Sequence, residues 1–134
     1  MDYQRNRIVH YLYYFSLTGL LILYLFPGSL IGWLIWRDFS QQPDFRQQPY
    51  GGTAINHFIA FFYLSILGLI SYMREVSFKK TVIFLIVLSI VLELSHLIIP
   101  NRSFQSLDLF ANLLGTLLAI VVIFFYKRLK NGKI

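Results

Sequence analysis

Four long apolar stretches constrain the fold of this chain more than any other feature of its sequence. A run of about 20 apolar residues is long enough to cross the hydrocarbon core of a bilayer as a helix. The chain has 134 residues, of which 57% are hydrophobic and 13% are charged, and this is too apolar for an ordinary soluble domain. We therefore predict an all-α, polytopic membrane protein, a single domain over residues 1–134 that forms a small bundle of four transmembrane helices. The predicted helices cover about residues 11–26, 54–73, 81–99 and 107–126.

The segment after the first apolar stretch has two interpretations. Pro27 and Gly28 interrupt the stretch, and residues 29–36 that follow are mostly apolar and contain two tryptophans. This segment either extends the helix after a kink or lies flat at the membrane interface, where Trp side chains are enriched, and we favour the interfacial position. Residues 27–53 then form a loop on the outer side. Its polar second half is expected to be irregular and is long enough to serve as a lid.

The twelve Lys and Arg residues, which help to give the chain a formal net charge of +6, divide unevenly between the two predicted membrane faces. One face has nine of them, namely Arg5, Arg7, Arg74, Lys79, Lys80, Lys127, Arg128, Lys130 and Lys133. The other face has Arg37, Arg46 and Arg102. The positive-inside rule places the first group, and with it both ends of the chain, in the cytoplasm. Because anionic lipid attracts such basic segments, the charge predicts contact with membrane lipids and no nucleic-acid partner.

Aromatic residues fall where the predicted helices leave the membrane. Tyr and Trp are enriched at both membrane–water interfaces. The residues expected at the inner interface are Tyr11, Tyr13 and Tyr14, and those expected at the outer interface are Tyr24, Phe26, Trp33 and Trp36. We therefore expect these seven side chains at the membrane surfaces.

Seven polar residues are predicted to meet at one depth near the outer face. The second predicted helix begins at that face, the third ends there and the fourth leaves it, so polar groups at these helix ends come together. They are Asn56, His57, Glu93, His96, Asp108 and Asn112, together with Arg102, which lies in the connection between the third and fourth predicted helices. At 1.5 Å per residue, Glu93 and Asn112 lie about 8–10 Å below the outer boundary, where charged groups are retained only if they pair or function. We call these seven residues the outer polar cluster.

The fourth predicted helix presents small and polar side chains on a single face. The residues that fall within about a third of a turn, at about 100° per residue, are Asp108, Ala111, Asn112, Gly115 and Ala119. Small residues allow the backbones of two helices to approach closely. The face that carries the polar groups is therefore also predicted to be the packing face.

Three kinds of chemistry fit the outer polar cluster. His57, Glu93 and Asp108 are candidates for general acid–base catalysis, because ionisable groups in a low dielectric have altered proton affinities. The candidates for ligand binding are Arg102, Asn112, His96 and Asn56, with the guanidinium holding an anionic head group. A divalent metal is a weaker alternative, for which the available ligands are His57, Glu93, His96 and Asp108. No cofactor is predicted, and the lack of cysteine excludes thiolate ligands.

A purely structural interpretation of the same residues stays open. Arg102 can pair with Glu93 or with Asp108 and so fix the register of the helices. Asn112 can serve as a hydrogen-bonding group between helices. The histidines can be neutral and satisfied inside the bundle, since a neutral imidazole needs one donor and one acceptor.

Two blocks of sequence resemble the VanZ-like family of bacterial membrane proteins over about residues 54–126. The second block reads Glu93-Leu-Ser-His96, Pro100-Asn101-Arg102 and Asp108-Leu-Phe-Ala-Asn112-Leu-Leu-Gly115. It is similar to the family's Glu-x-x-Gln, Pro-Gly-Arg-like and Asp-x-x-x-Asn-x-x-Gly elements. The first block reads Ile55-Asn56-His57-Phe-Ile-Ala-Phe61, where the family usually has acidic and Lys residues before the His and a Tyr four positions after it. The resemblance implies the site residues His57, Glu93, Arg102, Asp108 and Asn112, whereas His96 stands in place of the family's Gln and is particular to this chain.

The resemblance implies a fold and a site rather than a reaction. The family is linked to lower susceptibility to lipoglycopeptide antibiotics, so the expected location is the bacterial cytoplasmic (inner) membrane, crossed several times. We expect the protein to recognise or process the head group of an envelope lipid or cell-wall precursor in a polar pocket at the outer leaflet, and the question of catalysis stays open. The expected partners are membrane lipids and a cell-wall precursor or glycopeptide. The alternative is a small accessory subunit of a larger membrane protein complex, in which the outer polar cluster only fastens the helices together.

Overall fold

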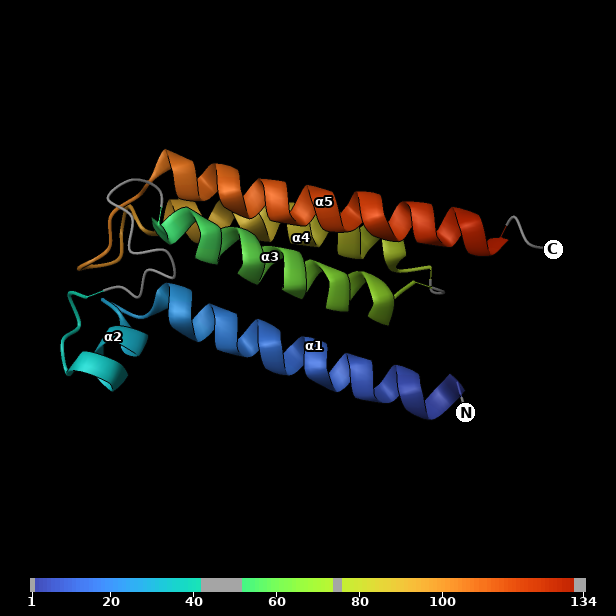
Figure 1. The fold of residues 1–134 in the computed structure, drawn as a ribbon, viewed down its shortest axis with the longest axis horizontal. Helices are drawn as coiled ribbons and strands as arrows, with labels where there is room; N and C mark the ends of the chain where they lie inside the picture. Colours follow the sequence, from blue (N-terminus) through green and yellow to red (C-terminus); the bar gives the residue numbers. More distant parts are fainter. Residues whose placement is uncertain (1, 42–51, 74–75, 132–134) are drawn as a thin grey trace.

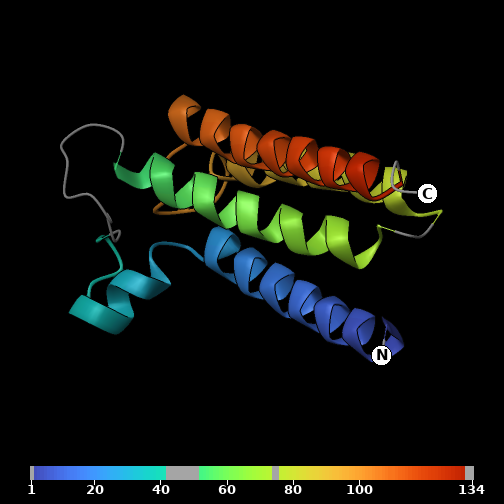
Figure 2. The same ribbon diagram turned by 45° about the vertical axis from the view of Figure 1, so that its right-hand side comes forward.

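The chain folds into α-helices, and the four long ones lie side by side (Figures 1 and 2). The computed structural model describes residues 2–41, 52–73 and 76–131, and no strand occurs among them. The helices are α1 (Asp2–Leu25), α2 (Leu30–Trp36), α3 (Gly52–Ser71), α4 (Phe78–Ser95) and α5 (Ser106–Asn131). The most extensive contact joins α3 to α5, and α1 packs mainly against α3. The prediction of an all-α fold is confirmed.

Three of the helices are long and apolar enough, by length and composition, to cross a membrane. The candidate spans are Arg7–Leu25 in α1, Ala54–Ser71 in α3 and Ser106–Lys130 in α5. α4 has 18 residues, but three of them, Lys79, Lys80 and Glu93, are charged. Candidate spans therefore exist for three of the four predicted transmembrane helices, and the crossing of the membrane by α4 stays a prediction.

The bounds of all four long helices differ from the predicted ranges, and α5, for example, ends at Asn131 rather than near residue 126. α4 ends at Ser95 because the N–H groups of residues 96–98 donate to carbonyls three residues earlier, at 3.0–3.1 Å, which tightens the turn. The predicted end was residue 99. α1 begins at Asp2 rather than near residue 11, so the helix continues beyond its apolar stretch into charged sequence.

The chain leaves its helical path after α1 and starts a separate helix. Pro27 disfavours a helical backbone at the residue before it, and Gly28 has a φ of 93°, a conformation that suits glycine. Ser29 then caps α2, since its Oγ accepts a hydrogen bond from the Gly32 N–H at 2.9 Å. α2 is thus not a continuation of α1. Its place at the membrane interface stays a prediction, and residues 42–51 of the predicted outer loop lie outside the described residues.

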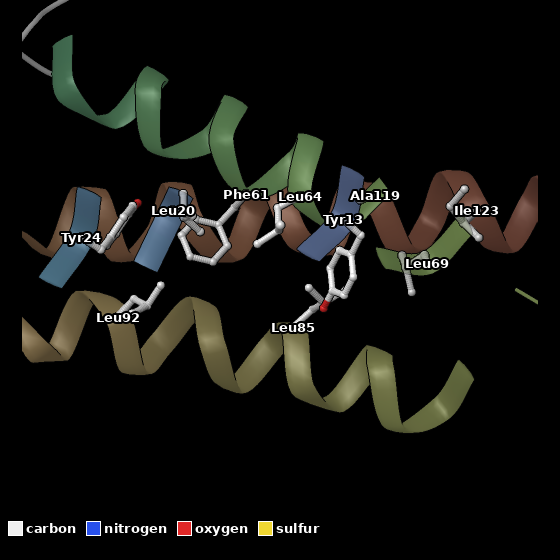
Figure 3. Packing of buried hydrophobic residues seen from close by; sticks show 10 residues of the cluster. All are labelled: Tyr13, Leu20, Tyr24, Phe61, Leu64, Leu69, Leu85, Leu92, Ala119 and Ile123. Atoms are coloured by element: carbon white, nitrogen blue, oxygen red, sulfur yellow. The ribbon is translucent and has the colours of Figure 1, made fainter. Parts of the chain in front are cut away.

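A buried apolar core runs along the bundle between the four long helices (Figure 3). It is made by Tyr13, Leu20 and Tyr24 of α1, Phe61, Leu64 and Leu69 of α3, Leu85 and Leu92 of α4, and Ala119 and Ile123 of α5. Tyr13 and Tyr24 are only 3% and 7% exposed. The prediction that these two tyrosines lie at the membrane surface is therefore wrong. Their position near a helix end says nothing about which face of the helix they occupy.

The two ends of the bundle gather different parts of the chain. α1 begins and α5 ends at one end, where α3 also turns back toward α4 (Figures 1 and 2). The opposite end holds α2 and the connection from α4 to α5, residues 96–105, next to the last turn of α1. The beginnings of α3 and α5 and the end of α4 lie there too, so the outer polar cluster belongs to this end.

Candidate functional site

Three helices bring one histidine and two carboxylates of the outer polar cluster together. His57 lies near the start of α3, Glu93 in the last turn of α4 and Asp108 in the first turn of α5. His57 Nδ1 is 3.5 Å from Glu93 Oε2, and His57 Nε2 is 3.6 Å from Asp108 Oδ2. The two carboxylates therefore flank different nitrogens of one imidazole ring, which is the arrangement expected of groups that exchange protons.

Glu93 is the centre of a buried hydrogen-bond network and has no exposed surface (0%). Its Oε1 accepts a hydrogen bond from the Gln105 N–H at 3.2 Å and lies 3.4 Å from His96 Nδ1. Its Oε2 accepts from Asn112 Nδ2 at 3.5 Å and faces His57. A buried carboxylate is tolerated only when it is paired and hydrogen-bonded, and both oxygens of Glu93 meet that condition.

Tyr24 of α1 belongs to this network, although its sequence position indicated a place at the membrane surface. Its hydroxyl donates to Asn112 Oδ1 at 2.9 Å and lies 2.8 Å from His57 Nδ1. The spacing of residues along α1, rather than the aromatic character of Tyr24, predicts this buried position. Residues that recur at the four- and three-residue intervals of a buried helix face are Tyr13, Leu17, Leu20 and Tyr24. That spacing predicts a buried Tyr24 pointing into the bundle.

His96 links α4 to α1. Its ring stacks on the ring of Tyr24 with the centroids 5.5 Å apart and the planes at 16°. Its Nε2 lies 3.2 Å from the backbone oxygen of Tyr24, and its Nδ1 faces Glu93. The tight turn that ends α4 makes this possible, since it directs His96 back over the last turns of α1.

Arg102 caps α1 rather than pairing with a carboxylate. Its Nη2 donates to the Leu23 carbonyl at 2.5 Å and its Nε to the Phe26 carbonyl at 3.3 Å, where a helix end leaves carbonyls without partners. No described carboxylate lies within 4.0 Å of the guanidinium, so neither alternative ion pair, with Glu93 or with Asp108, forms. Burial lowers the pKa of Arg102, and the charge of Glu93 opposes that shift. An arginine remains protonated at neutral pH in such surroundings.

A cavity of about 160 Å³ opens beside the network. Its polar lining consists of Tyr24, Ser29, Asn56, His57, His96 and Arg102, and leucine, isoleucine and alanine side chains of α1, α2 and α3 complete it. Three of the predicted ligand-binding residues thus share one cavity, whereas Asn112 lies behind it with no exposed surface. His57 belongs to both the cavity and the network and connects them.

Three of the four predicted metal ligands also come together. His57, Glu93 and Asp108 each offer one ligand atom, and these atoms all lie within 4.8 Å of one another. His96 hydrogen-bonds to Glu93 and so orients this carboxylate from behind. Nitrogen and carboxylate oxygen ligands are compatible with a divalent transition metal.

The close packing of α5 on α3 positions Asp108 and Asn112. The five residues of the predicted packing face, Asp108, Ala111, Asn112, Gly115 and Ala119, are all buried, which confirms that prediction. A Cβ atom at Gly115 would lie 2.5 Å from the Phe58 carbonyl oxygen of α3. The lack of a side chain there lets the two backbones touch and brings the polar start of α5 against His57.

Comparison with known proteins agrees with the resemblance found in the sequence. The family model described as VanZ/LLP1 matches residues 17–127. This range contains every residue of the outer polar cluster and extends through α2 and residues 17–25 of α1. Searches of curated proteins and of solved structures found no match.

Proposed function

The chain belongs to the VanZ/LLP1 family, and from this premise we propose that it binds the anionic head group of an envelope lipid or cell-wall precursor. Family membership and three apolar helices identify a membrane protein. The proposed location is the bacterial cytoplasmic membrane, crossed several times, and the proposed binding site is the cavity beside His57 at the outer leaflet.

The observation that carries this proposal is the position of Arg102. Its guanidinium lines the cavity, is partly buried and has no described carboxylate within 4.0 Å. Two of its five N–H groups contact the carbonyls of Leu23 in α1 and of Phe26 just after it, and three therefore remain for a ligand. Arginine suits phosphate and carboxylate because its planar fork forms paired, charge-assisted hydrogen bonds.

The size of the cavity limits what enters it. A volume of about 160 Å³ corresponds to roughly five water molecules at about 30 Å³ each. A single phosphate or carboxylate group fits this space, and a whole lipid does not. We infer that the head group enters between α1, α2 and α3 while the hydrocarbon part stays in the bilayer.

Replacing Arg102 with glutamine is expected to weaken head-group binding about tenfold or more, because a hydrogen bond to a charged group contributes about 1.5–3 kcal/mol. The measurement is native mass spectrometry of the purified protein with a polyprenyl phosphate and with the corresponding polyprenol. The phosphate form should bind the wild-type protein and the alcohol should not.

The matched control is Arg37→Gln, at an exposed arginine that lies over Trp33 at 4.8 Å outside the cavity. Arg102→Lys keeps the positive charge but changes the hydrogen bonds to the end of α1, so it separates the effect of the charge from the effect of the cap. The proposal is wrong if Arg102→Gln stays folded and binds the phosphate form as well as Arg37→Gln does.

The proposed topology has four spans with both chain ends in the cytoplasm. The basic residues at the end of the bundle where α1 begins include Arg7, Lys79, Lys80, Lys127, Arg128 and Lys130. The opposite end has Arg37 and Arg102, and this asymmetry supports a cytoplasmic position for the first group. The 18 residues of α4 extend about 27 Å, close to the thickness of the hydrocarbon core of about 30 Å, and lysines at its start can reach the interface.

Cysteine labelling tests this topology directly, because the chain has no cysteine of its own. In spheroplasts, a membrane-impermeant maleimide is expected to label Ser40→Cys and to label Lys130→Cys only after lysis. Both positions are exposed. Labelling of Lys130→Cys before lysis would contradict the proposed orientation.

A second candidate is an accessory subunit whose outer polar cluster only fastens the helices. The complete burial of Glu93 and Asn112 favours it, because buried, hydrogen-bonded groups between helices also serve packing. Folded Asp108→Asn and His57→Ala variants separate the two. Head-group binding should fall in both if the cavity is a site, and a purely structural cluster would change only the yield of folded protein.

A further inference from the structure

The hydrogen bonds around Asn112 have a fixed direction. Its Nδ2 lies 3.4 Å from the Ser89 carbonyl oxygen and 3.5 Å from Glu93 Oε2, and both of these atoms are acceptors. The amide nitrogen must therefore point toward them, since the reverse orientation would set three oxygens against one another. This leaves Oδ1, which can only accept, facing the hydroxyl of Tyr24.

The orientation of Asn112 determines which atom donates in the hydrogen bonds of Tyr24 and His57. The Tyr24 hydroxyl has one hydrogen and gives it to Asn112 Oδ1. Its contact with His57 Nδ1 at 2.8 Å then requires the ring nitrogen to donate. His57 is thus protonated on Nδ1, and in a neutral ring Nε2 carries the lone pair.

The lone pair of His57 Nε2 faces Asp108 Oδ2 at 3.6 Å. Two electron-rich atoms are stable in this arrangement only if a cation lies between them, either a proton or a metal ion. The distance is long for a charge-assisted hydrogen bond, which is about 2.7–2.9 Å. Two ligands of a tetrahedral zinc ion, each about 2.0–2.2 Å from the metal, lie about 3.3–3.6 Å apart, and this spacing matches.

We propose that His57 Nε2, Asp108 and Glu93 bind a divalent first-row transition-metal ion. Each of the three residues, from α3, α5 and α4, offers one ligand atom, an imidazole nitrogen or a carboxylate oxygen, and these atoms lie within 4.8 Å of one another. The described cationic side chains within 4.0 Å of Glu93 are two imidazoles, those of His57 and His96, and both ring nitrogens of His96 face acceptors, the Tyr24 carbonyl and Glu93 Oε1. A divalent ion between the ligands would add to the compensation that the completely buried carboxylate of Glu93 requires.

Neighbouring groups hold the ligands in place as metal sites require. Tyr24 accepts the hydrogen of His57 Nδ1, which directs Nε2 toward the ion. Gln105 and His96 hold Oε1 of Glu93, and Asn112 donates to Oε2, which keeps a second lone pair for the ion. Such outer contacts fix the tautomer and the orientation of ligands. Three protein ligands leave one position open, and because His57 also lines the cavity, that position is accessible to a ligand there.

The inference goes beyond the proposed head-group binding and does not depend on it, so its test contains no lipid. Purified full-length protein is treated with chelator, equilibrated with Zn²⁺ or Mn²⁺ and analysed for bound metal per chain by elemental analysis and for affinity by calorimetry. We expect one ion per chain. Asp108→Asn keeps the shape of the side chain and should lower the affinity at least tenfold.

The matched control is Asp38→Asn, at a residue in the connection after α2 whose carboxylate holds Ser40. It should bind the ion as the wild-type protein does. If Asp108→Asn does not fold, His57→Gln replaces it, with His10→Gln as the control at the other end of the bundle. Absence of a stoichiometric ion in the wild-type protein, or equal affinity in a folded Asp108→Asn or His57→Gln variant, would overturn the proposal and assign the cation to a protonated His57.

Discussion

Replacing Glu93 with alanine is expected to lower the free energy of unfolding by about 3–5 kcal/mol, the range for removing one partner of a buried ionic network. The carboxylate has no exposed surface and accepts hydrogen bonds from Gln105 and Asn112. Without it, these donors and Nδ1 of His96 lose an acceptor inside the bundle, and His57 loses a neighbouring carboxylate. Thermal or denaturant unfolding in a mild detergent, followed by circular dichroism, measures the change.

Two further variants identify the cause of this loss. Val91→Ala shortens an exposed side chain of the same helix, and changes of this kind usually stay within about 0.5 kcal/mol. Glu93→Gln keeps a carbonyl oxygen for the Gln105 N–H and removes the charge. Its loss of unfolding free energy should therefore lie between those of Val91→Ala and Glu93→Ala. Equal stabilities of Glu93→Ala and Val91→Ala would show that the network contributes nothing to folding.

The sequence was sufficient to predict which helices bring polar residues together and that these residues share one end of the bundle. Hydropathy located the apolar stretches, and the up-and-down order of the helices placed His57, Glu93 and Asp108 at one end of the bundle. In the structure, the His57 ring lies 3.5 Å from the carboxylate of Glu93 and 3.6 Å from that of Asp108. These positions follow from distances along helix axes, which a sequence determines well.

The contacts of α1 with the site could not be predicted in the same way. Arg102 bonds to carbonyls of Leu23 and Phe26, which lie 79 and 76 positions earlier in the chain. Backbone acceptors at a helix end are present in every sequence, so residue types carry no signal of such a bond. The role of Tyr24 depends on how α1 is rotated about its axis. The spacing of Tyr13, Leu17, Leu20 and Tyr24, which repeats every seven residues, indicates that rotation. The presence of an aromatic residue near a helix end does not.

The confirmed packing face of α5 leads to the second large effect, the destabilisation of the bundle by Gly115→Ala. The added Cβ would lie 2.5 Å from the Phe58 carbonyl oxygen and 3.0 Å from the Phe62 amide nitrogen. Both are backbone atoms of α3 and cannot move aside as a flexible side chain can. We expect α5 to shift away from α3, with a loss of about 1–3 kcal/mol, the range for overpacking a core.

Gly19→Ala is the matched control, since a Cβ there has no atom within 4 Å and the residue also lies inside a helix. Alanine favours a helix over glycine by about 1 kcal/mol, so Gly19→Ala should be neutral or stabilising while Gly115→Ala lowers the unfolding temperature. Because α5 also carries Asp108 and Asn112, its shift should weaken metal binding as well, although Gly115 is not itself a proposed ligand. Equal unfolding temperatures for the two variants would show that α3 and α5 do not approach as closely as their backbones indicate.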